Sequence, residues 1–345
     1  MTDLAEDAVA FEGLLEASAP MVAETARVPR RSNVSDVKLG ALCWNQYTDW
    51  PGLLASGVRA EHLGYDTLWT WDHLYPIVGN HEGPIFEGWL TLAAWAQATE
   101  RIRIGLMVGA NTFREPALTA KMATTLDHIS AGRAILGIGA AWFETEHRAY
   151  GLAFGDGPPE RLRWLSEALP VMRDMLRGRP ATSAGPRYVS RNVRNDPLPI
   201  QPRLPLLVGG GGERVTLKLV ARYADANNLG GGPANVKRKE AILLQHCETV
   251  GRDPAEIERT AVVGAVTIRN TRAEAVLVAD TIHQANGGAR PGTTAQIGSP
   301  EDVAESLAPY VELGYRHLIA DFPAPHDDES MTRFATEVRA LLEGG

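Results

Sequence analysis

Residues 67–73, TLWTWDH, form the stretch that decides the fold. From Thr67 to Trp71 every side chain is β-branched, aromatic or large and apolar, which is typical of a buried strand. Asp72 and His73 follow at the carboxyl end of this strand. In a closed parallel barrel the functional loops converge at that end, so an acid beside an imidazole is a candidate pair for proton transfer. In the alternative interpretation, Asp72 caps a turn and His73 is a surface residue.

Short apolar runs alternate with helical periodicity from Lys38 onward, which is the pattern of repeated βα units. The predicted strands are residues 39–44, 67–72, 103–109, 134–139, 206–209, 225–229, 259–268 and 317–322. This even alternation of about eight strands with helices predicts a (β/α)₈ TIM barrel with insertions at its C-terminal mouth. A doubly wound open sheet is the alternative, but it requires a switch point that the alternation does not show.

Three segments stand outside the alternation. Residues 178–202, which are rich in Pro, Gly, Arg and Asn, and the Gly- and Thr-rich residues 286–296 are predicted to cross the mouth and shape the substrate pocket. Residues 1–36 are predicted to be a separate, acidic and helical extension before the barrel domain of residues 37–345. This extension lacks a basic head followed by an apolar stretch, so it is not expected to be a signal peptide.

Composition narrows the class of partner. A hydrophobic content of 44% and a charged content of 22% are ordinary for a soluble globular protein. The formal charge of -8 disfavours nucleic acid and anionic membranes, and no apolar run is long enough to span a bilayer. Cys43 and Cys247 form no CxxC pattern, so we expect reduced, partly buried thiols and a cytoplasmic location. A small molecule is the expected partner.

Glycine-rich segments follow two of the predicted strands. Gly209, Gly210, Gly211 and Gly212 lead into a helix, so their backbone N–H groups are predicted to bind an anion such as phosphate, unless the segment is a simple turn. The sequence GIGAAW at residues 137–142 begins like a dinucleotide fingerprint. It places a tryptophan where the third small residue belongs, which excludes a Rossmann nicotinamide site.

The residues around the second glycine segment favour a planar ligand instead. Gly139 and Ala140 are small enough to leave room at the mouth for a flat ring. Aromatic residues gather near the predicted strand ends, which makes an apolar, π-rich pocket plausible: Trp44, Tyr47, Trp71, Phe113, Trp142 and Phe143. Among these, Trp44 and Trp142 are the predicted substrate contacts.

Several chemistries lack their motifs. The nine histidines contain neither HxH nor HExxH, so a zinc hydrolase is not expected and no metal site is predicted. The predicted strand ends do not supply the two carboxylates of a glycosidase. The chain also has no GxSxG elbow and no Walker A loop. Cofactor chemistry is therefore favoured over hydrolysis.

Four blocks of sequence, in order, resemble the luciferase-like monooxygenase superfamily, in its branch that uses the deazaflavin coenzyme F420. The blocks are AEHLGYDTLW at residues 60–69 with Asp72 and His73; NTFREPA at 111–117 with Ala120 and Lys121; DHISAGR at 127–133 through GIG at 137–139 and Trp142; and LVGGGG at 207–212 with ARYAD at 221–225. The resemblance covers the chain from about Lys38 to its end. Residues 1–36 are not part of it.

The resemblance implies a TIM-like barrel, commonly a homodimer, that binds F420 at its mouth. It places His73 near the reacting ring carbon as the catalytic residue and Asp72 in contact with the cofactor. It also places the non-prolyl cis peptide of the family at Met107 and Val108, and it makes the four glycines from Gly209 the phosphate-binding loop. Asn111, Gly139 and Ala140 complete the predicted cofactor contacts.

These residues lead to one preferred function and two alternatives. The preferred function is hydride transfer between F420 and an organic substrate, with His73 donating or accepting the accompanying proton. The alternatives are an FMN-dependent monooxygenase of the same superfamily and a cofactor-binding protein without turnover. The resemblance implies that some relatives that oxidise sugar phosphates carry a glutamate where this chain has Trp142, which weakens the case for a sugar-phosphate substrate.

Overall fold

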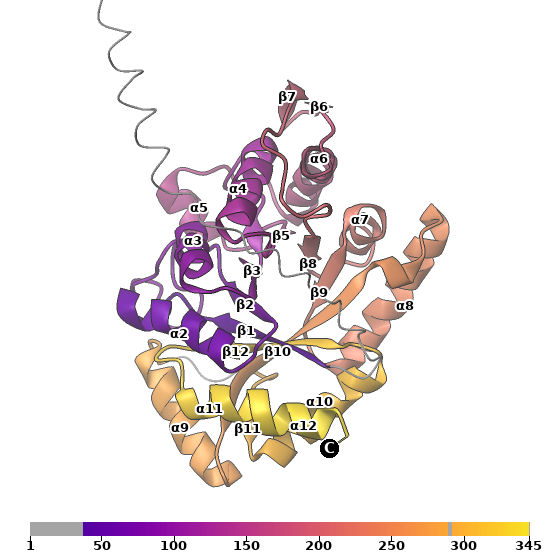
Figure 1. Cartoon of the computed structure of the whole chain (residues 1–345). Coiled ribbons are helices and arrows are strands. Elements are labelled where there is room, and N and C mark those ends of the chain that lie inside the picture. The colour runs from indigo at the N-terminus through magenta and orange to yellow at the C-terminus, as the bar shows by residue number, and fades with distance from the viewer. Residues whose placement is uncertain (1–36, 289–291, 345) are drawn as a thin grey trace, which may run out of the picture. The chain divides into compact units, whose positions relative to one another are not determined.

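Eight parallel strands close into a barrel (Figure 1). Their order around the ring is β1 (Lys38–Cys43), β2 (Thr67–Thr70), β3 (Arg103–Leu106), β5 (Ala134–Gly139), β8 (Leu206–Gly209), β9 (Ala226–Leu229), β10 (Glu258–Ile268) and β12 (His317–Phe322). The last strand, β12, pairs with both β10 and β1, which closes the ring. The structure is a computed structural model that describes residues 37–288 and 292–344. The predicted (β/α)₈ barrel is confirmed.

Helices surround the barrel (Figure 1). They are α2 (Trp50–His62), α3 (Gly88–Ala98), α4 (Pro116–Ile129), α5 (Glu144–Tyr150), α6 (Pro158–Leu176), α7 (Thr216–Tyr223), α8 (Pro233–Val250), α9 (Arg272–Ala285), α10 (Pro300–Glu312), α11 (Asp328–Arg333) and α12 (Arg339–Leu342), with a π-helical turn at Phe334–Val338 and a 3₁₀ turn at Pro254–Glu256. Local sequence sets several of their starts. Asp49 caps α2 by accepting the Gly52 N–H at 2.7 Å, and Pro116 occupies the first position of α4.

Large apolar side chains fill the inside of the barrel. They come from strands around the ring and from the residue after β3, and they include Leu42, Trp69, Met107, Ile135, Leu207 and Ile319. These side chains are buried against one another, so the barrel interior is a packed core. Burial of each large apolar side chain stabilises the fold by about 1.5–3 kcal/mol. Catalytic space is therefore confined to the mouth.

Several predicted elements differ from the structure. Residues 178–202 contain an antiparallel hairpin, β6 (Ala181–Ala184) and β7 (Val189–Val193), where an aperiodic loop was expected. The third strand ends at Leu106, and a short strand β4 (Gly109–Ala110) follows it. The helix after the glycines begins at Thr216, three residues later than expected, and β11 (Gln296–Gly298) adds a further strand beside β10.

Other sequence predictions have mixed outcomes. The extension at residues 1–36 lies outside the described residues. Cys43 and Cys247 are both free and buried, as expected. In the described part of the chain, every helix is too short or too polar to cross a bilayer.

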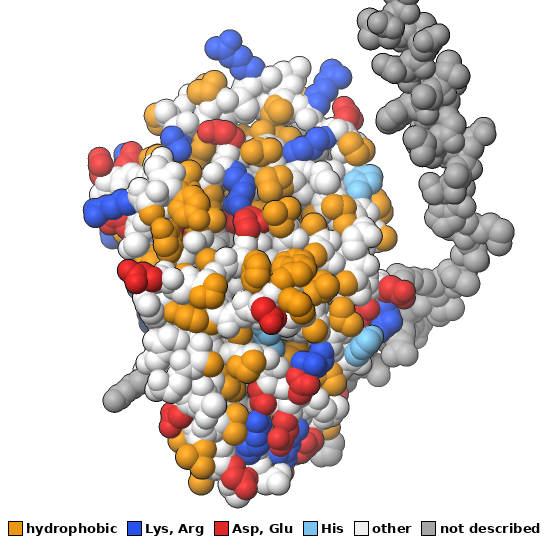
Figure 2. Space-filling view, turned by 90° about the vertical axis from the view of Figure 1, so that its left-hand side faces the viewer, with side chains coloured by type: hydrophobic (Ala, Val, Ile, Leu, Met, Phe, Trp, Pro, Cys, Tyr) orange, Lys and Arg blue, Asp and Glu red, His pale blue; other side chains and the backbone are white. Residues whose placement is uncertain are grey.

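On the side where α2 and α3 lie in Figure 1, hydrophobic side chains gather across the middle of the surface (Figure 2).

Candidate active site

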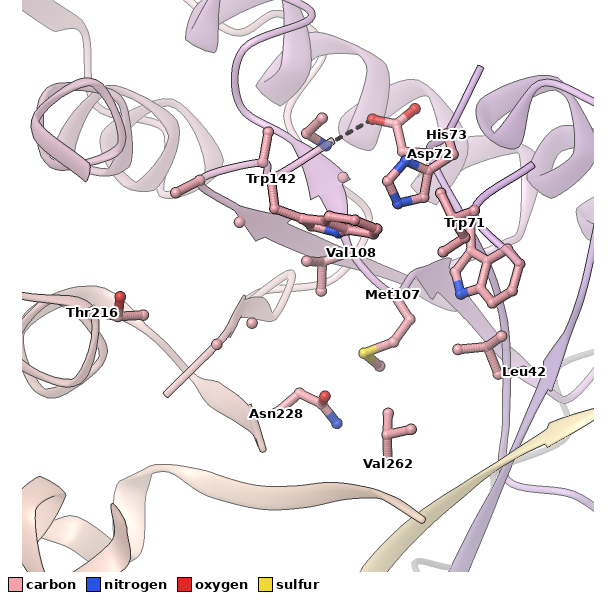
Figure 3. Close-up of a pocket in the computed structure, with 18 of the residues that line it drawn as sticks. Leu42, Trp71, Asp72, His73, Met107, Val108, Trp142, Thr216, Asn228 and Val262 are labelled. Atoms are coloured by element: carbon pink, nitrogen blue, oxygen red, sulfur yellow. Dashed lines mark hydrogen bonds between the residues drawn. The ribbon is translucent and has the colours of Figure 1, made fainter. Parts of the chain in front are cut away.

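A cavity of about 430 Å³ opens at the carboxyl ends of the strands. Nine of the predicted site residues line it: Asp72, His73, Met107, Val108, Gly139, Ala140, Trp142, Gly209 and Gly210. Figure 3 shows the imidazole of His73 pointing into the space that Trp142, Trp71 and Met107 surround. The imidazole and the first two glycines of the predicted phosphate loop thus share one cavity.

The His73 ring is held by a buried glutamate. Nδ1 of His73 lies 2.8 Å from Oε1 of Glu146, and Oε2 of Glu146 accepts the Leu74 N–H at 2.8 Å. Because a carboxylate only accepts hydrogen bonds, the proton of neutral His73 resides on Nδ1. Nε2 then carries a free lone pair and has no hydrogen-bond partner among residues 37–288 and 292–344. Glu146 therefore orients an imidazole whose second nitrogen is available for proton transfer.

Asp72 makes its contacts with the protein. Its carboxylate accepts the Ala110 N–H at 2.9 Å and two hydrogen bonds from Arg114, at 2.7 and 3.0 Å. Arg114 also reaches Glu87 at 3.1 Å. Burial raises the pKa of the Asp72 carboxyl above its ordinary value, and the adjacent Arg114 guanidinium offsets part of that increase. This ion pair joins the end of β2 to the start of α4 at the cavity wall.

The peptide bond between Met107 and Val108 is cis, as the family resemblance implied. The side chain of Val108 lies between two of the glycines. A Cβ added to Gly139 would come within 2.9 Å of Val108 Cγ2, and one added to Gly209 within 2.8 Å of the same atom. Gly139 was predicted to leave room for a flat ring, and Gly209 was predicted to belong to an anion-binding loop. In the structure they first of all make room for Val108.

Gly137 lies two residues before Gly139 on β5, on the same face of the strand, and has less space for a side chain. A Cβ there would lie 2.0 Å from the carbonyl oxygen of Leu106, so Gly137→Ala must push β5 away from the β3–β4 segment. We expect this variant to lower the free energy of unfolding by about 2 kcal/mol or more, measured by urea denaturation. Gly230→Ala is the control, because its added Cβ meets nothing closer than the Val262 carbonyl at 3.9 Å. Equal stability of the two variants would contradict the prediction.

The structure does not bring four predicted contacts to the cavity. Trp44 is buried behind Trp71, with ring centroids 4.7 Å apart, because the side chain packs into the barrel interior. Asn111 is also buried, and its amide donates to the Tyr188 hydroxyl of the hairpin insertion at 3.2 Å. Gly211 and Gly212 lie beyond the lining on the same loop. Trp142, by contrast, lines the cavity and is 60% exposed.

The predicted phosphate loop and the two predicted insertions at the mouth, residues 178–202 and 286–296, also differ from expectation. The Gly210 N–H already donates to the Asn228 carbonyl at 3.1 Å, so it is not free for an anion. The nearby cation Lys239 is paired with Glu213 at 2.8 Å. No described residue of the two insertions lines the cavity. The cavity lining therefore comes from the strand ends and from the loops directly after them.

Several lining residues were not predicted from the sequence. They are Leu42, Ile77, Gly109, Ala110, Ala141, Glu146, Thr216, Asn228, Val262 and Asp321, whereas Trp71 was expected among the aromatic residues of the pocket. Glu146 and Asp321 are the two acids among them. Burial raises the pKa of the Asp321 carboxyl to about 7.

Comparison with known proteins identifies the family. Residues 38–291 match the family described as luciferase-like monooxygenase. The chain belongs to this family. Within it, the F420-dependent glucose-6-phosphate dehydrogenase of Kineococcus radiotolerans is 31% identical over 324 residues, which cover 85% of this chain and 93% of that protein. The protein of the same description from Intrasporangium calvum is 29% identical and covers 83% of this chain and 93% of its own.

Solved structures share the barrel fold of this chain. The coenzyme F420-dependent tetrahydromethanopterin reductase from Methanopyrus kandleri superposes with a TM-score of 0.73 at 18% identity, covering 89% of this chain and 99% of that one. An F420-dependent secondary alcohol dehydrogenase, solved with an F420-acetone adduct, also gives a TM-score of 0.73, at 20% identity and with 88% and 98% coverage. At these identities the likeness concerns the fold.

Proposed function

We propose that this protein is an oxidoreductase that transfers a hydride between coenzyme F420 and a small organic substrate. The observation that carries the proposal is the imidazole of His73, oriented through Nδ1 by Glu146 and open to the cavity at Nε2. The match to F420-dependent dehydrogenases over most of both chains supports F420 as the cofactor.

The lining of the cavity fits a planar redox ring. Its volume of about 430 Å³ lies in the usual range for small-molecule sites. Met107 and Val108 form an apolar wall, and Gly139 and Ala140 beside them present little side chain. We assign the ring of F420 to the wall of Met107 and Val108. We assign the rest of the cofactor to the side of Gly209, since this glycine lines the same cavity.

The protein's own residues would manage the proton. Bound F420 would supply the hydride chemistry. In the oxidising direction, Nε2 of His73 accepts the proton of the substrate hydroxyl, and in the reducing direction it returns that proton to the carbonyl oxygen. Glu146 keeps the ring oriented in both directions. The indoles of Trp71 and Trp142 would cover part of a bound substrate and limit its contact with water.

A sugar phosphate is not the substrate that we propose, although several relatives are named for one. Among the described residues, the cavity lining contains neither lysine nor arginine, so a phosphate dianion would have no cationic partner there. Trp142 also presents a large apolar surface where the family resemblance implies a glutamate in some sugar-phosphate enzymes. An uncharged or cationic organic molecule suits this lining better.

Titration of the full chain with F420 and with FMN tests the proposal. We expect a Kd for F420 that is lower than that for FMN by about tenfold or more. Anaerobic loss of oxidised F420 with a panel of alcohols then tests turnover. Tighter FMN binding with oxygen consumption would favour the monooxygenase alternative. Tight F420 binding without turnover on any substrate would favour the non-catalytic one. A homodimer stays a prediction.

A further inference from the structure

The carboxyl group of Asp321 is a polar feature of the cavity that the proposed proton transfer does not use. Asp321 lies on β12, and in the parallel register it pairs with Leu42 of β1, which also lines the cavity. Its Oδ1 atom is buried and has no hydrogen-bond partner among residues 37–288 and 292–344. A buried carboxylate oxygen without a partner costs free energy, and a hydrogen-bond donor on a molecule bound in the cavity would remove this cost.

The barrel places this carboxyl away from the proposed ring site. In the ring of strands, three strands separate β12 from β5 on either side, so Asp321 lies across the barrel from Gly139 and Ala140. Its strand neighbours contribute Leu42 and Val262, which Figure 3 shows on the opposite side of the cavity from Trp142. A ring held on the β3–β5 wall thus leaves the side of Asp321 to the second reactant.

The surroundings of Asp321 define what that reactant must supply. Leu42 and Val262 are apolar, and burial alone raises the pKa of the Asp321 carboxyl, since no charged group contributes to the shift. Ile319, two residues earlier on β12, belongs to the apolar cluster that fills the barrel interior. A hydroxyl or amino group of a ligand in the cavity would supply the hydrogen-bond donor that this carboxyl lacks.

We propose that Asp321 is a specificity-determining residue that accepts a hydrogen bond from a hydroxyl or amino group of the substrate. This assignment rests on the proposed function, because it takes the β3–β5 wall as the place of the F420 ring. It narrows the substrate class to small molecules that carry a donor in addition to their reacting carbon. Purely apolar ketones and ethers would leave the carboxylate unpaired.

The test uses two variants of the full chain. Asp321→Leu replaces the carboxyl by an apolar group of similar size, and Asp321→Asn keeps an acceptor oxygen but removes the charge. Asp280→Leu, at an exposed position on α9, is the control. Thermal unfolding first checks that all three fold. We expect Asp321→Leu to melt no lower than wild type, because it removes an unpaired buried polar atom.

Binding is then measured by ligand-detected NMR with two matched sets of probes. One set is benzyl alcohol, benzylamine, benzyl methyl ether and benzaldehyde; the other is cyclohexanol, cyclohexylamine, cyclohexyl methyl ether and cyclohexanone. We expect wild type to prefer the alcohols and amines, and Asp321→Leu to bind these about tenfold more weakly. Asp321→Asn should lose amine binding more than alcohol binding, because charge-assisted hydrogen bonds are the stronger ones.

Two results would overturn the proposal. One is a wild-type protein that shows no preference for the donors, including one that binds no probe. The other is an Asp321→Leu protein that keeps the preference for alcohols and amines, or one that loses binding of the ketone and aldehyde probes instead. Titration with F420 distinguishes the sources of the donor: unchanged cofactor binding in Asp321→Leu supports a substrate contact, and weakened binding contradicts it. If wild type fails to bind F420, the proposed function fails, while the probes alone still decide the role of Asp321.

Discussion

Replacing His73 with alanine is expected to lower kcat by about 10²- to 10⁴-fold, the range that a positioned general acid or base contributes. The Kd for F420 should change little, because the aromatic and glycine-lined walls remain. The reason is that Nε2 of His73 is the proton-transfer atom of the proposed reaction, held in place through Nδ1 by Glu146. Stopped-flow measurement of F420 reduction, with a parallel binding titration, separates the two effects.

Two further variants sharpen this prediction. His62→Ala removes an exposed histidine at the end of α2 and should leave kcat unchanged. Glu146→Gln keeps the shape but lets an amide N–H face Nδ1, which moves the proton of neutral His73 to Nε2. We expect kcat to fall by about tenfold or more with little change in F420 binding. Unchanged turnover in His73→Ala would remove this residue from the mechanism.

The barrel was predictable because its strands and helices differ in their periodicity. Strands buried on both faces are continuous apolar runs, and both β5 and β12 have the bounds that the sequence predicts. The hairpin β6–β7 was missed because its strands are short, mostly exposed and polar, so they show no alternation. Tertiary contacts such as Tyr188 with Asn111 hold it instead.

Two acids of the site, Glu146 and Asp321, were harder to predict than Asp72 and His73. Helix α5 spans seven residues, too few for a hydrophobic period to show that Glu146 is buried and Glu144 exposed. Asp321 lies in a strand that is buried on both faces, so alternation does not show which face it occupies. The register with Leu42 decides that, and register is a property of the assembled sheet.

The glycines illustrate a correct position with an incomplete reason. Sequence placed Gly139 and Gly209 at strand ends near a ligand, and both do line the cavity. It could not show that the side chain of Val108, from the segment between β3 and β4, lies between these two glycines. Close approaches of this kind depend on contacts between segments far apart in the sequence.

Replacing Asp72 with alanine is expected to lower the free energy of unfolding by about 3–5 kcal/mol, because it leaves the Arg114 guanidinium without its main partner. The side chains of Asp72 and Arg114 are only 2% and 16% exposed, so water replaces the lost contacts poorly. The Ala110 N–H loses its acceptor as well. Urea denaturation at neutral pH measures the loss.

A surface ion pair provides the matched control. Arg148 and Glu144 on α5 are 78% and 51% exposed at a separation of 2.7 Å, so Glu144→Ala should cost about 0.5 kcal/mol or less. Combining Asp72→Ala with Arg114→Met should destabilise by less than the sum of the single variants, since the second change removes the stranded charge. Additive losses would mean that the two side chains act independently.

Asp72→Asn separates a structural role for this residue from a direct cofactor contact. Asparagine can still accept the Ala110 N–H, but it loses the ion pair with Arg114. If Asp72 acts by holding the cavity wall together, the Kd for F420 should rise in Asp72→Asn and Asp72→Ala in proportion to the loss of stability of each variant. If its carboxylate contacts the cofactor, Asp72→Asn should weaken F420 binding beyond what its stability predicts. The three hydrogen bonds that the carboxylate already makes within the protein favour the first outcome.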